Sequence, residues 1–149
     1  MVMKVENTTL ENTLFSYISK IRKRSGYFIE REAQARGINL AYSHMRIITI
    51  LYFNKKLSMK ELTERLVRDK STVTSLVNKL EVEGYIKKTV CSKDKRVTFL
   101  ELKEKSQEVI DVVIEISKLF QEKVDKILEP EETKTMYKLM KKLADNWVD

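Results

Sequence analysis

The chain has 149 residues, of which 42% are hydrophobic and 34% are charged, and its net charge is +7. This length suits one domain with a real core, and 3 Gly and 1 Pro favour a mainly helical fold over an all-β fold with many tight turns. The longest apolar run, residues 47–53, is too short to cross a bilayer, so no membrane partner is expected. The N-terminus has no apolar signal-peptide core and one cysteine offers no disulfide framework, so we expect a cytoplasmic protein.

The positive charge is concentrated in the middle third of the chain. Residues 55–100 hold 12 Lys or Arg and 6 Asp or Glu, whereas the remaining residues hold 17 and 16. A basic segment inside a balanced chain is typical of an element that binds a polyanion. A solvated surface with a chance bias is the alternative interpretation.

Residues 8–36 are predicted to form one long helix, because apolar side chains recur there at spacings of three, four or seven. This stripe consists of Leu10, Leu14, Tyr17, Ile18, Ile21 and Phe28. Gly37 is expected to end the helix. Residues 41–53 are predicted to form a second, strongly apolar helix, which residues 54–56 end as a polar turn.

A short third helix is predicted to begin at Ser58. Glu61 follows three residues later, so the two side chains can form a capping box in which each accepts the other residue's free backbone N–H. The residues of this helix expected to face the core are Met59, Leu62 and Leu66. Asp69 is a good N-cap for a fourth helix, and Gly84 is expected to end that helix with Tyr85 folding back on Leu80.

The fourth helix has two different faces. At about 100° per residue its apolar side chains fall together, and they are Val73, Leu76, Val77 and Leu80. The opposite face holds Ser71, Thr74, Ser75 and Asn78, with Thr72 and Lys79 at its border. Glu and Lys would form a helix better at solvent-facing positions. A short, uncharged polar face therefore suits close approach to another surface and hydrogen bonding to it.

Residues 86–91 and 97–102 are predicted to be two strands, because β-branched and aromatic residues dominate them. The sequence between them, "SKDKR", forms the tip of a hairpin. Asp94 can pair with Arg96 there and fix the direction of that long side chain, although an exposed pair adds only ~0–1 kcal/mol of stability. The alternative is that Asp94 is simply a good turn residue.

Two helices are predicted at the C-terminal end, over residues 103–128 and 130–147. Pro130 fits the first turn of the last helix. Glu131 and Glu132 are favourable there, because acidic side chains stabilise the positive N-terminal end of a helix. The apolar stripe of this last helix consists of Met136, Leu139, Met140, Leu143 and Trp147.

A short capped helix, a turn, a helix with a polar outer face and a basic hairpin follow the order of a winged helix-turn-helix. The second of these helices would enter the major groove of DNA. The side chains expected to contact DNA there are Ser71, Thr72, Thr74, Ser75, Asn78 and Lys79. The wing residues are Lys93, Asp94, Lys95 and Arg96, with Arg96 placed for the minor groove. Backbone phosphates are expected to contact Lys60, Lys70 and Lys88.

The segments "MKELTERLVRDKSTVTSLVNKLEVEGYIKK" and "SKDKRVTFLEL" resemble the bacterial MarR-type (multiple-antibiotic-resistance regulator) transcription factors. Members carry a similar "ELA-x-x-L" and "STVT-x-L-x-x-x-LE-x-x-G" run and an Asp-x-Arg wing tip. These motifs stand here as Glu61-Leu62-Thr63 with Leu66, as Ser71 to Thr74 with Leu80 and Gly84, and as Asp94-Lys95-Arg96. They cover about residues 57–105, and the flanking helices match in length and order.

The resemblance implies a mainly α fold with a small β-wing, a winged helix-turn-helix with N- and C-terminal dimerisation helices, forming a single MarR-like domain over residues 1–149. Residues 8–36 and 103–149 would form the dimerisation helices and residues 41–102 the DNA-binding lobe. A homodimer would then bind a pseudo-palindromic operator in double-stranded DNA as a transcriptional regulator, and we expect a repressor.

The resemblance also implies release by a small aromatic or anionic effector, bound in a cleft between the dimerisation helices and the lobe. Tyr17, Tyr42, His44 and Arg46 could line such a cleft by their position. Packing and capping at a helix junction is the competing interpretation of the same four residues.

The sequence departs from the family pattern at two places. Many members follow the wing with Leu-Thr-Glu-x-Gly, whereas Lys103 and Ser106 occupy the corresponding places here, so the start of the fifth helix is expected to be straighter. Lys95 stands where members often have a second arginine, and lysine is a less directional partner for phosphates.

No metal, cofactor or catalytic site is expected. The chain has one histidine and one cysteine, no glycine-rich phosphate loop and no grouped carboxylates, so an enzyme is the least favoured class. Cys91 is interpreted as strand packing, although a thiol exposed beside Lys93 could oxidise. The alternative function is a winged-helix protein-interaction module without specific DNA binding, against which the basic bias and the polar helix face count.

Overall fold

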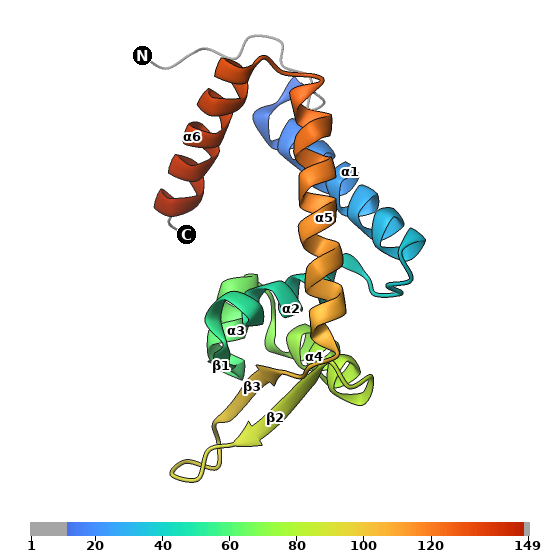
Figure 1. The fold of residues 1–149 in the computed structure, drawn as a ribbon. Helices are drawn as coiled ribbons and strands as arrows, with labels where there is room; N and C mark the ends of the chain where they lie inside the picture. Colours follow the sequence, from blue (N-terminus) through green and yellow to red (C-terminus); the bar gives the residue numbers. More distant parts are fainter. Residues whose placement is uncertain (1–11, 148–149) are drawn as a thin grey trace. The chain divides into compact units, whose positions relative to one another are not determined.

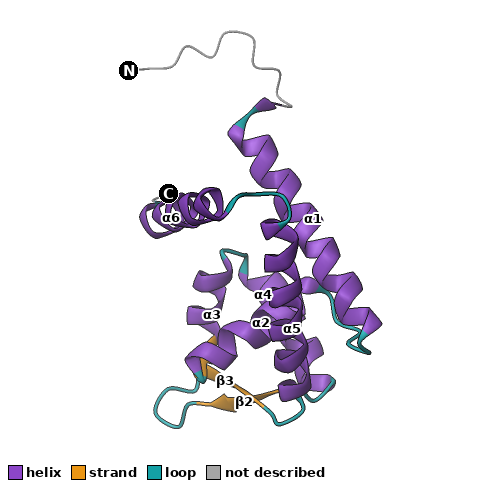
Figure 2. Cartoon of the chain, turned by 45° about the horizontal axis from the view of Figure 1, so that its top comes forward, coloured by secondary structure: helices purple, strands orange, loops and turns teal. Residues whose placement is uncertain are grey.

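The computed structural model describes residues 12–147. Six helices and three strands follow one another in the order α1, α2, β1, α3, α4, β2, β3, α5 and α6 over these residues (Figures 1 and 2). The mainly α fold with a small antiparallel sheet that the sequence predicts is confirmed. The chain divides into two compact units, one up to Val113 and one from Ile114 onward.

Helix α1, Leu14–Ala35, begins later than the predicted start at residue 8. Thr13 is its N-cap and accepts a hydrogen bond from the backbone N–H of Ser16 at 3.1 Å. The predicted residues 8–11, with Leu10, lie outside the described residues. The helix ends at Gly37 as predicted: its φ of +84° suits glycine, and Ile38 N donates to the carbonyl of Ala33 at 3.0 Å.

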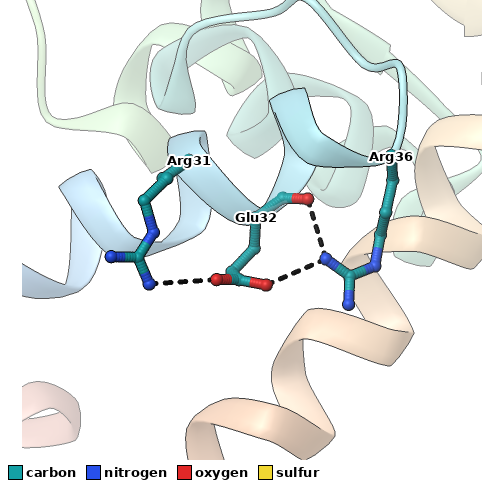
Figure 3. A network of polar contacts seen from close by, with 3 residues as sticks. All are labelled: Arg31, Glu32 and Arg36. Carbon is teal, nitrogen blue, oxygen red and sulfur yellow. Dashed lines mark hydrogen bonds and ion pairs between the residues drawn. The ribbon is translucent and has the colours of Figure 1, made fainter.

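A charged cluster closes the last turn of α1 (Figure 3). Arg36 Nη1 donates to the backbone carbonyl of Glu32 at 2.8 Å and to its Oε2 at 3.0 Å, while Arg31 Nη2 lies 3.0 Å from Oε1. These arginines lower the pKa of the Glu32 carboxyl, Arg36 most of all. Because Arg36 satisfies a carbonyl in the last turn, the cluster stabilises the end of α1.

Helix α2, Tyr42–Asn54, supplies much of the core. Its buried apolar residues are Met45, Ile47, Ile48 and Leu51. The helix ends at Lys55, whose φ is +62°. The predicted polar turn is wrong at Lys56, because Lys56–Ser58 forms strand β1 and pairs with the third strand of the sheet. Leu57 of β1 is buried opposite Leu100, which explains why this short segment joins the sheet.

Helices α3, Met59–Leu66, and α4, Lys70–Val82, form the predicted helix-turn-helix. Both arms of the predicted capping box between Ser58 and Glu61 are present, at 2.7 and 3.2 Å. Leu62 and Leu66 are buried as expected, whereas Met59 is half-buried. Val67, which is not a glycine, adopts a left-handed conformation between the two helices, with φ of +50°.

Asp69 caps α4 as predicted and accepts from the backbone N–H of Thr72 at 2.8 Å. The helix buries Val73, Val77 and Leu80, and Gly84 ends it with φ of +83°. Tyr85 N donates to the carbonyl of Leu80 at 2.9 Å. This is the predicted Schellman cap, and it turns the chain directly into the wing.

The wing consists of β2, Ile86–Val90, and β3, Thr98–Leu102, each one residue shorter than predicted. The antiparallel sheet has the strand order β1-β3-β2, with Lys88 opposite Leu100 and Lys87 opposite Glu101. Side chains two residues apart share a face of a sheet. Lys88 therefore shares the face of buried Ile86 and Leu100, and Lys87 lies on the other face.

Helix α5, Ser106–Asp125, is shorter than the predicted 103–128 at both ends. The prediction is wrong at its start because Tyr85 holds the preceding backbone: its carbonyl accepts from Lys103 N at 2.9 Å and also from the buried Ser106 Oγ. Lys103 thereby extends the sheet pairing, and the helix begins only at Ser106. None of the helices in the described residues is long and apolar enough to traverse a bilayer.

Helix α6, Pro130–Asn146, begins at Pro130 as predicted. Glu129 and Glu132 form a capping box, in which Glu129 N donates to Glu132 Oε2 at 2.9 Å. The helix ends one residue before the predicted position 147, so Trp147 of the predicted apolar stripe is its C-cap and the other four residues lie within the helix. None of the residues of α6 is buried.

Candidate nucleic-acid interface

The outer face of α4 lies opposite its buried residues and carries the predicted recognition side chains. Ser71, Ser75, Asn78 and Lys79 are exposed, and Thr72 and Thr74 are half-buried at the edges of the face. Val82 continues this face toward the end of the helix and is also exposed. Apart from Lys79 and Val82, the face therefore consists of short polar side chains, as its sequence predicts.

Three hydroxyls at the start of α4 are already committed to internal hydrogen bonds. Ser71 Oγ and Thr72 Oγ1 each donate to the Asp69 carboxylate at 2.7 Å, and Thr74 Oγ1 donates to the carbonyl of Lys70 at 2.8 Å. A carboxylate and a carbonyl can only accept, so each of these hydroxyls donates its hydrogen to its partner within the chain. Toward an outside partner these three hydroxyls therefore offer acceptors.

The Asp69 carboxylate is held ionised by the same bonds. Donation from Ser71 and then Thr72 lowers the pKa of Asp69 far below its ordinary 3.8. Ser75, one turn further along, has no side-chain partner in the part of the chain that the structure describes, so its hydroxyl is free to donate as well as to accept.

Asn78 is tied to the wing rather than left free. The ammonium of Lys88 donates to Asn78 Oδ1 and forms an ion pair with Glu81 Oε2 at 2.8 Å. Only 25% of the Lys88 side chain is exposed, against 49% for Lys79 and 56% for Lys87. This cluster connects the recognition helix directly to strand β2.

The wing tip carries the predicted pair of Asp94 and Arg96. Arg96 Nε lies 3.1 Å from Asp94 Oδ1 and Nη2 lies 3.3 Å from Oδ2, while Arg96 N donates to Oδ1 at 2.9 Å. These bonds lower the pKa of Asp94, and the side chain of Arg96 is 92% exposed. Lys93 and Lys95 are exposed beside it without an ion-pair partner in residues 12–147.

The remaining cationic side chains expected at the interface differ in their exposure and in their ion-pair partners. Lys70 is exposed in the first turn of α4, and Lys60 on α3 is exposed with Glu64 at 4.0 Å. Lys79 lies 3.8 Å from Glu83. Lys88 is occupied by Asn78 and Glu81, so its ammonium supports the neighbouring helix in this conformation and is not turned outward to a phosphate.

The four residues considered for an effector cleft are not hydrogen-bonded to one another in the described part of the chain. Tyr17 lies on α1 and donates to Asn12 Oδ1 at 3.2 Å. Tyr42 begins α2, where its N–H donates to Glu30 Oε1 at 2.7 Å, and Arg46 follows one turn later, half-buried.

His44 is buried, and its Nδ1 has no hydrogen-bond partner among the described residues. Burial is the main cause that lowers the pKa of His44, and the positive charge of Lys79 lowers it further. The negative charge of Glu83 raises this pKa by a smaller amount. Helix α2, on which His44 lies, packs against α4. Within the described residues no three His, Cys, Asp or Glu side chains gather as metal ligands, and Cys91 is a half-buried free thiol.

Two features of this interface were not foreseen from the sequence. The first is Glu81, which neutralises Lys88 while Lys88 binds Asn78. The second is Lys105, whose Nζ donates to the carbonyl of Glu83 at 2.8 Å and lies 4.3 Å from the centre of the Tyr85 ring. The hydrogen bonds from Ser71 and Thr72 to Asp69 could be predicted from the sequence, because an N-cap side chain commonly accepts from residues two and three positions ahead.

Comparison with known proteins identifies the family. The model of the MarR family matches residues 40–98. The HTH-type transcriptional regulator SarZ from Staphylococcus aureus is 32% identical over an alignment of 126 residues, with 80% of each chain covered. The HTH-type transcriptional regulator BilQ from Clostridium symbiosum is 28% identical over 137 residues, covering 91% of this chain and 92% of BilQ.

Solved structures share the fold. A crystal structure of MarR has a TM-score of 0.83 at 20% identity and covers 94% of each chain. A mutant MarR from E. coli complexed with operator DNA has a TM-score of 0.80 at 16% identity, over 91% of this chain and 99% of that one. The order of elements, the two sequence motifs and these relatives agree: the chain belongs to the MarR family of winged-helix transcriptional regulators and is not an enzyme.

Proposed function

We propose that the protein binds double-stranded DNA by sequence, as a homodimer on a pseudo-palindromic operator, and represses transcription there. The observation that carries this proposal is the pairing of an uncharged, short polar face on α4 with an exposed basic tip on the wing. The first suits readout of base edges and the second suits the phosphate backbone and the minor groove.

This geometry supports the following assignment of contacts. Ser71, Thr72, Thr74, Ser75 and Asn78, with Lys79 beside them, enter the major groove. Lys60, near the start of α3, and Lys70, at the start of α4, neutralise phosphates. Lys93, Lys95 and Arg96 contact the backbone and adjacent minor groove, with Asp94 orienting Arg96. A mutant MarR from E. coli has the same fold and is complexed with operator DNA, which supports DNA binding by this fold.

A second copy of the chain is the partner that the flanking helices need. The apolar side chains of α6 and of Trp147, which follows it, are exposed by 41% or more: Met136, Leu139, Met140, Leu143 and Trp147. Helix α1 exposes Leu14, Phe15 and Ile21 in the same way. Apolar surface of this extent is covered in a stable soluble protein. A homodimer would also present two α4 helices to the two halves of a palindrome.

Repression and its relief are the finer parts of the proposal. A protein that contacts DNA through α4 and the wing and contacts a second copy through its flanking helices would act most simply by occupying a promoter. A small aromatic or anionic effector would release DNA by binding beside Tyr17, Tyr42, His44 and Arg46. Arg46 offers the charge for an anion, and the tyrosines offer rings.

Salt-titrated binding tests the proposal. The purified full-length chain is mixed with DNA from upstream of its own gene and with unrelated DNA of equal length, and the mass of each complex is measured. We expect two chains per site, tighter binding to the upstream DNA and a steep loss of affinity with salt.

Equal, weak binding to both DNAs, and to all fragments in a genome-wide selection, would overturn the proposal. That outcome would instead favour a winged-helix module that binds another protein. Addition of benzoate and related aromatic carboxylates to the specific complex tests the effector, since release at unchanged salt is expected only if the cleft is real.

A further inference from the structure

Lys88 and Asn78 meet across the junction of the recognition helix and the wing. Lys88 lies on strand β2, on the sheet face shared with buried Ile86 and Leu100, and its ammonium reaches Asn78 Oδ1 and Glu81 Oε2 on α4. Glu81 is one turn from Asn78 along the helix, so the two oxygens hold the ammonium from one side of α4.

The chemistry of lysine decides which way the Asn78 amide turns. An ammonium can only donate, so the atom of Asn78 that faces Lys88 must be the carbonyl oxygen. Turning the amide over would set its NH₂ donors against the ammonium and forfeit a hydrogen bond assisted by a full charge. The NH₂ group of Asn78 is consequently directed away from Lys88, and it has no partner within the described residues.

This arrangement changes what Asn78 can read in DNA. An asparagine recognises adenine by donating to N7 while accepting from the N6 amino group, and it needs both ends of its amide for that pair. Here Lys88 takes one of the two lone pairs of the Asn78 carbonyl oxygen, and its full positive charge beside the other makes that oxygen a weaker acceptor for the amino group of adenine. The NH₂ end keeps its donors, which match the adjacent N7 and O6 acceptors of guanine or the O4 acceptor of thymine.

We propose that Lys88 is a specificity-determining positioning residue, which fixes Asn78 as a hydrogen-bond donor so that its base position favours guanine or thymine and disfavours adenine. The proposal rests on the proposed function, because it requires α4 to lie in the major groove. Lys88 itself touches no base. Glu81 stabilises the largely buried Lys88 side chain by forming an ion pair with its ammonium.

Selection of bound sequences from a random DNA pool tests this role. The full-length protein and its Asn78→Ala variant are compared first, and the base position whose preference is lost in Asn78→Ala is the one that Asn78 reads. At that position we expect wild type to disfavour adenine by about tenfold, within the range of one good base contact. Lys88→Met removes the donor at similar length, so it should free the Asn78 carbonyl and raise the share of adenine there.

Two further variants separate positioning from loss of fold or charge. Lys88→Arg still donates and should keep the wild-type preference. Lys87→Met removes the same charge from the next residue, whose Nζ lies 3.6 Å from Glu101 on the other face of the sheet, and should also keep it. Circular dichroism checks that all variants are folded at the selection temperature.

The outcomes are distinct. Adenine preferred by wild type at the Asn78 position, no position altered in Asn78→Ala, or identical preferences of Lys88→Met and wild type would each overturn this inference while leaving the proposed function standing. A wild-type protein that selects no motif at all would overturn the proposed function together with it.

Discussion

The outer face of α4 and the tip of the wing are both assigned to DNA, yet they are built in opposite ways. On α4 the polar groups are short, and most are already bonded to Asp69, Lys70 or Lys88. At the tip, Lys93, Lys95 and Arg96 are long, charged and exposed. A fixed pattern of donors and acceptors discriminates between bases, whereas exposed cations attract any phosphate backbone. We therefore propose that α4 supplies sequence specificity and the wing supplies general attraction to DNA.

The largest effect should come from removing the charge of the wing. The combined Lys93→Ala, Lys95→Ala and Arg96→Ala variant should bind specific and unrelated DNA more weakly alike. Its plot of log affinity against log salt should become shallower by about 0.9 for each phosphate that the wing no longer neutralises. Fluorescence anisotropy across a salt series measures both quantities. Removing three lysines of α6, Lys134, Lys138 and Lys142, is the control, and an equally large fall in affinity there would refute a special role of the wing.

A smaller and more selective effect is expected from Ser75→Ala. Ser75 is the hydroxyl of the face with no internal partner within the described residues, so its removal should cost one base preference, about 1–3 kcal/mol of discrimination, and leave the salt slope unchanged. Sequence selection with each variant measures this. Ser25→Ala on α1, where the hydroxyl donates to Arg22 O at 3.1 Å, is the matched control. An unchanged motif in Ser75→Ala would place the recognition face elsewhere.

Asp69 connects the stability of α4 to its reading surface. Asp69→Ala removes the N-cap and frees the hydroxyls of Ser71 and Thr72, and we expect the Tm to fall by about 3 °C. Since the pKa of Asp69 is lowered by folding, its stabilising effect is fully present above its ordinary value of 3.8 and is lost as the pH falls toward the lowered value. Thermal melts should therefore converge for wild type and Asp69→Ala at low pH. Asp69→Asn, which keeps a cap, should melt close to wild type at neutral pH.

The mildest change predicted is Asp94→Ala. Its pair with Arg96 is exposed, so the Tm should stay the same and affinity should fall only about twofold to threefold, because Arg96 is no longer held in one direction. Arg96→Ala should weaken binding more than this and reduce preference in the flanking minor groove. A clear fall in the Tm of Asp94→Ala would show instead that Asp94 serves the turn.

Local signals in the sequence predicted most of this fold. The Ser58–Glu61 capping box, the Asp69 cap and the turn at Gly84 each depend on residues within a few positions of one another, and all are present. Strand β1 was missed because three residues show no alternation, and its partner strand β3 lies far along the chain. The start of α5 was wrong because the carbonyl of Tyr85, far back in the chain, holds Lys103 and Ser106.

The same distinction holds for the candidate interface. Residue types and helical spacing place the recognition side chains on one face, and the Asp94–Arg96 pair lies within one hairpin tip. Which polar atoms remain free is a different matter. Lys88 reaches Asn78 only because the Gly84 turn folds β2 back beside α4, so the donor character of Asn78 is a property of the tertiary structure.

The division between the two regions is tested most directly by one measurement: the ratio of Kd on unrelated DNA to Kd on the selected site, for wild type and for the combined wing variant, at one moderate salt concentration. We expect wild type to prefer its site by about 10³-fold or more. The wing variant should bind both DNAs more weakly and keep most of that ratio. A wing variant whose ratio collapses to near one would contradict the account, because it would place sequence discrimination in the wing rather than on α4.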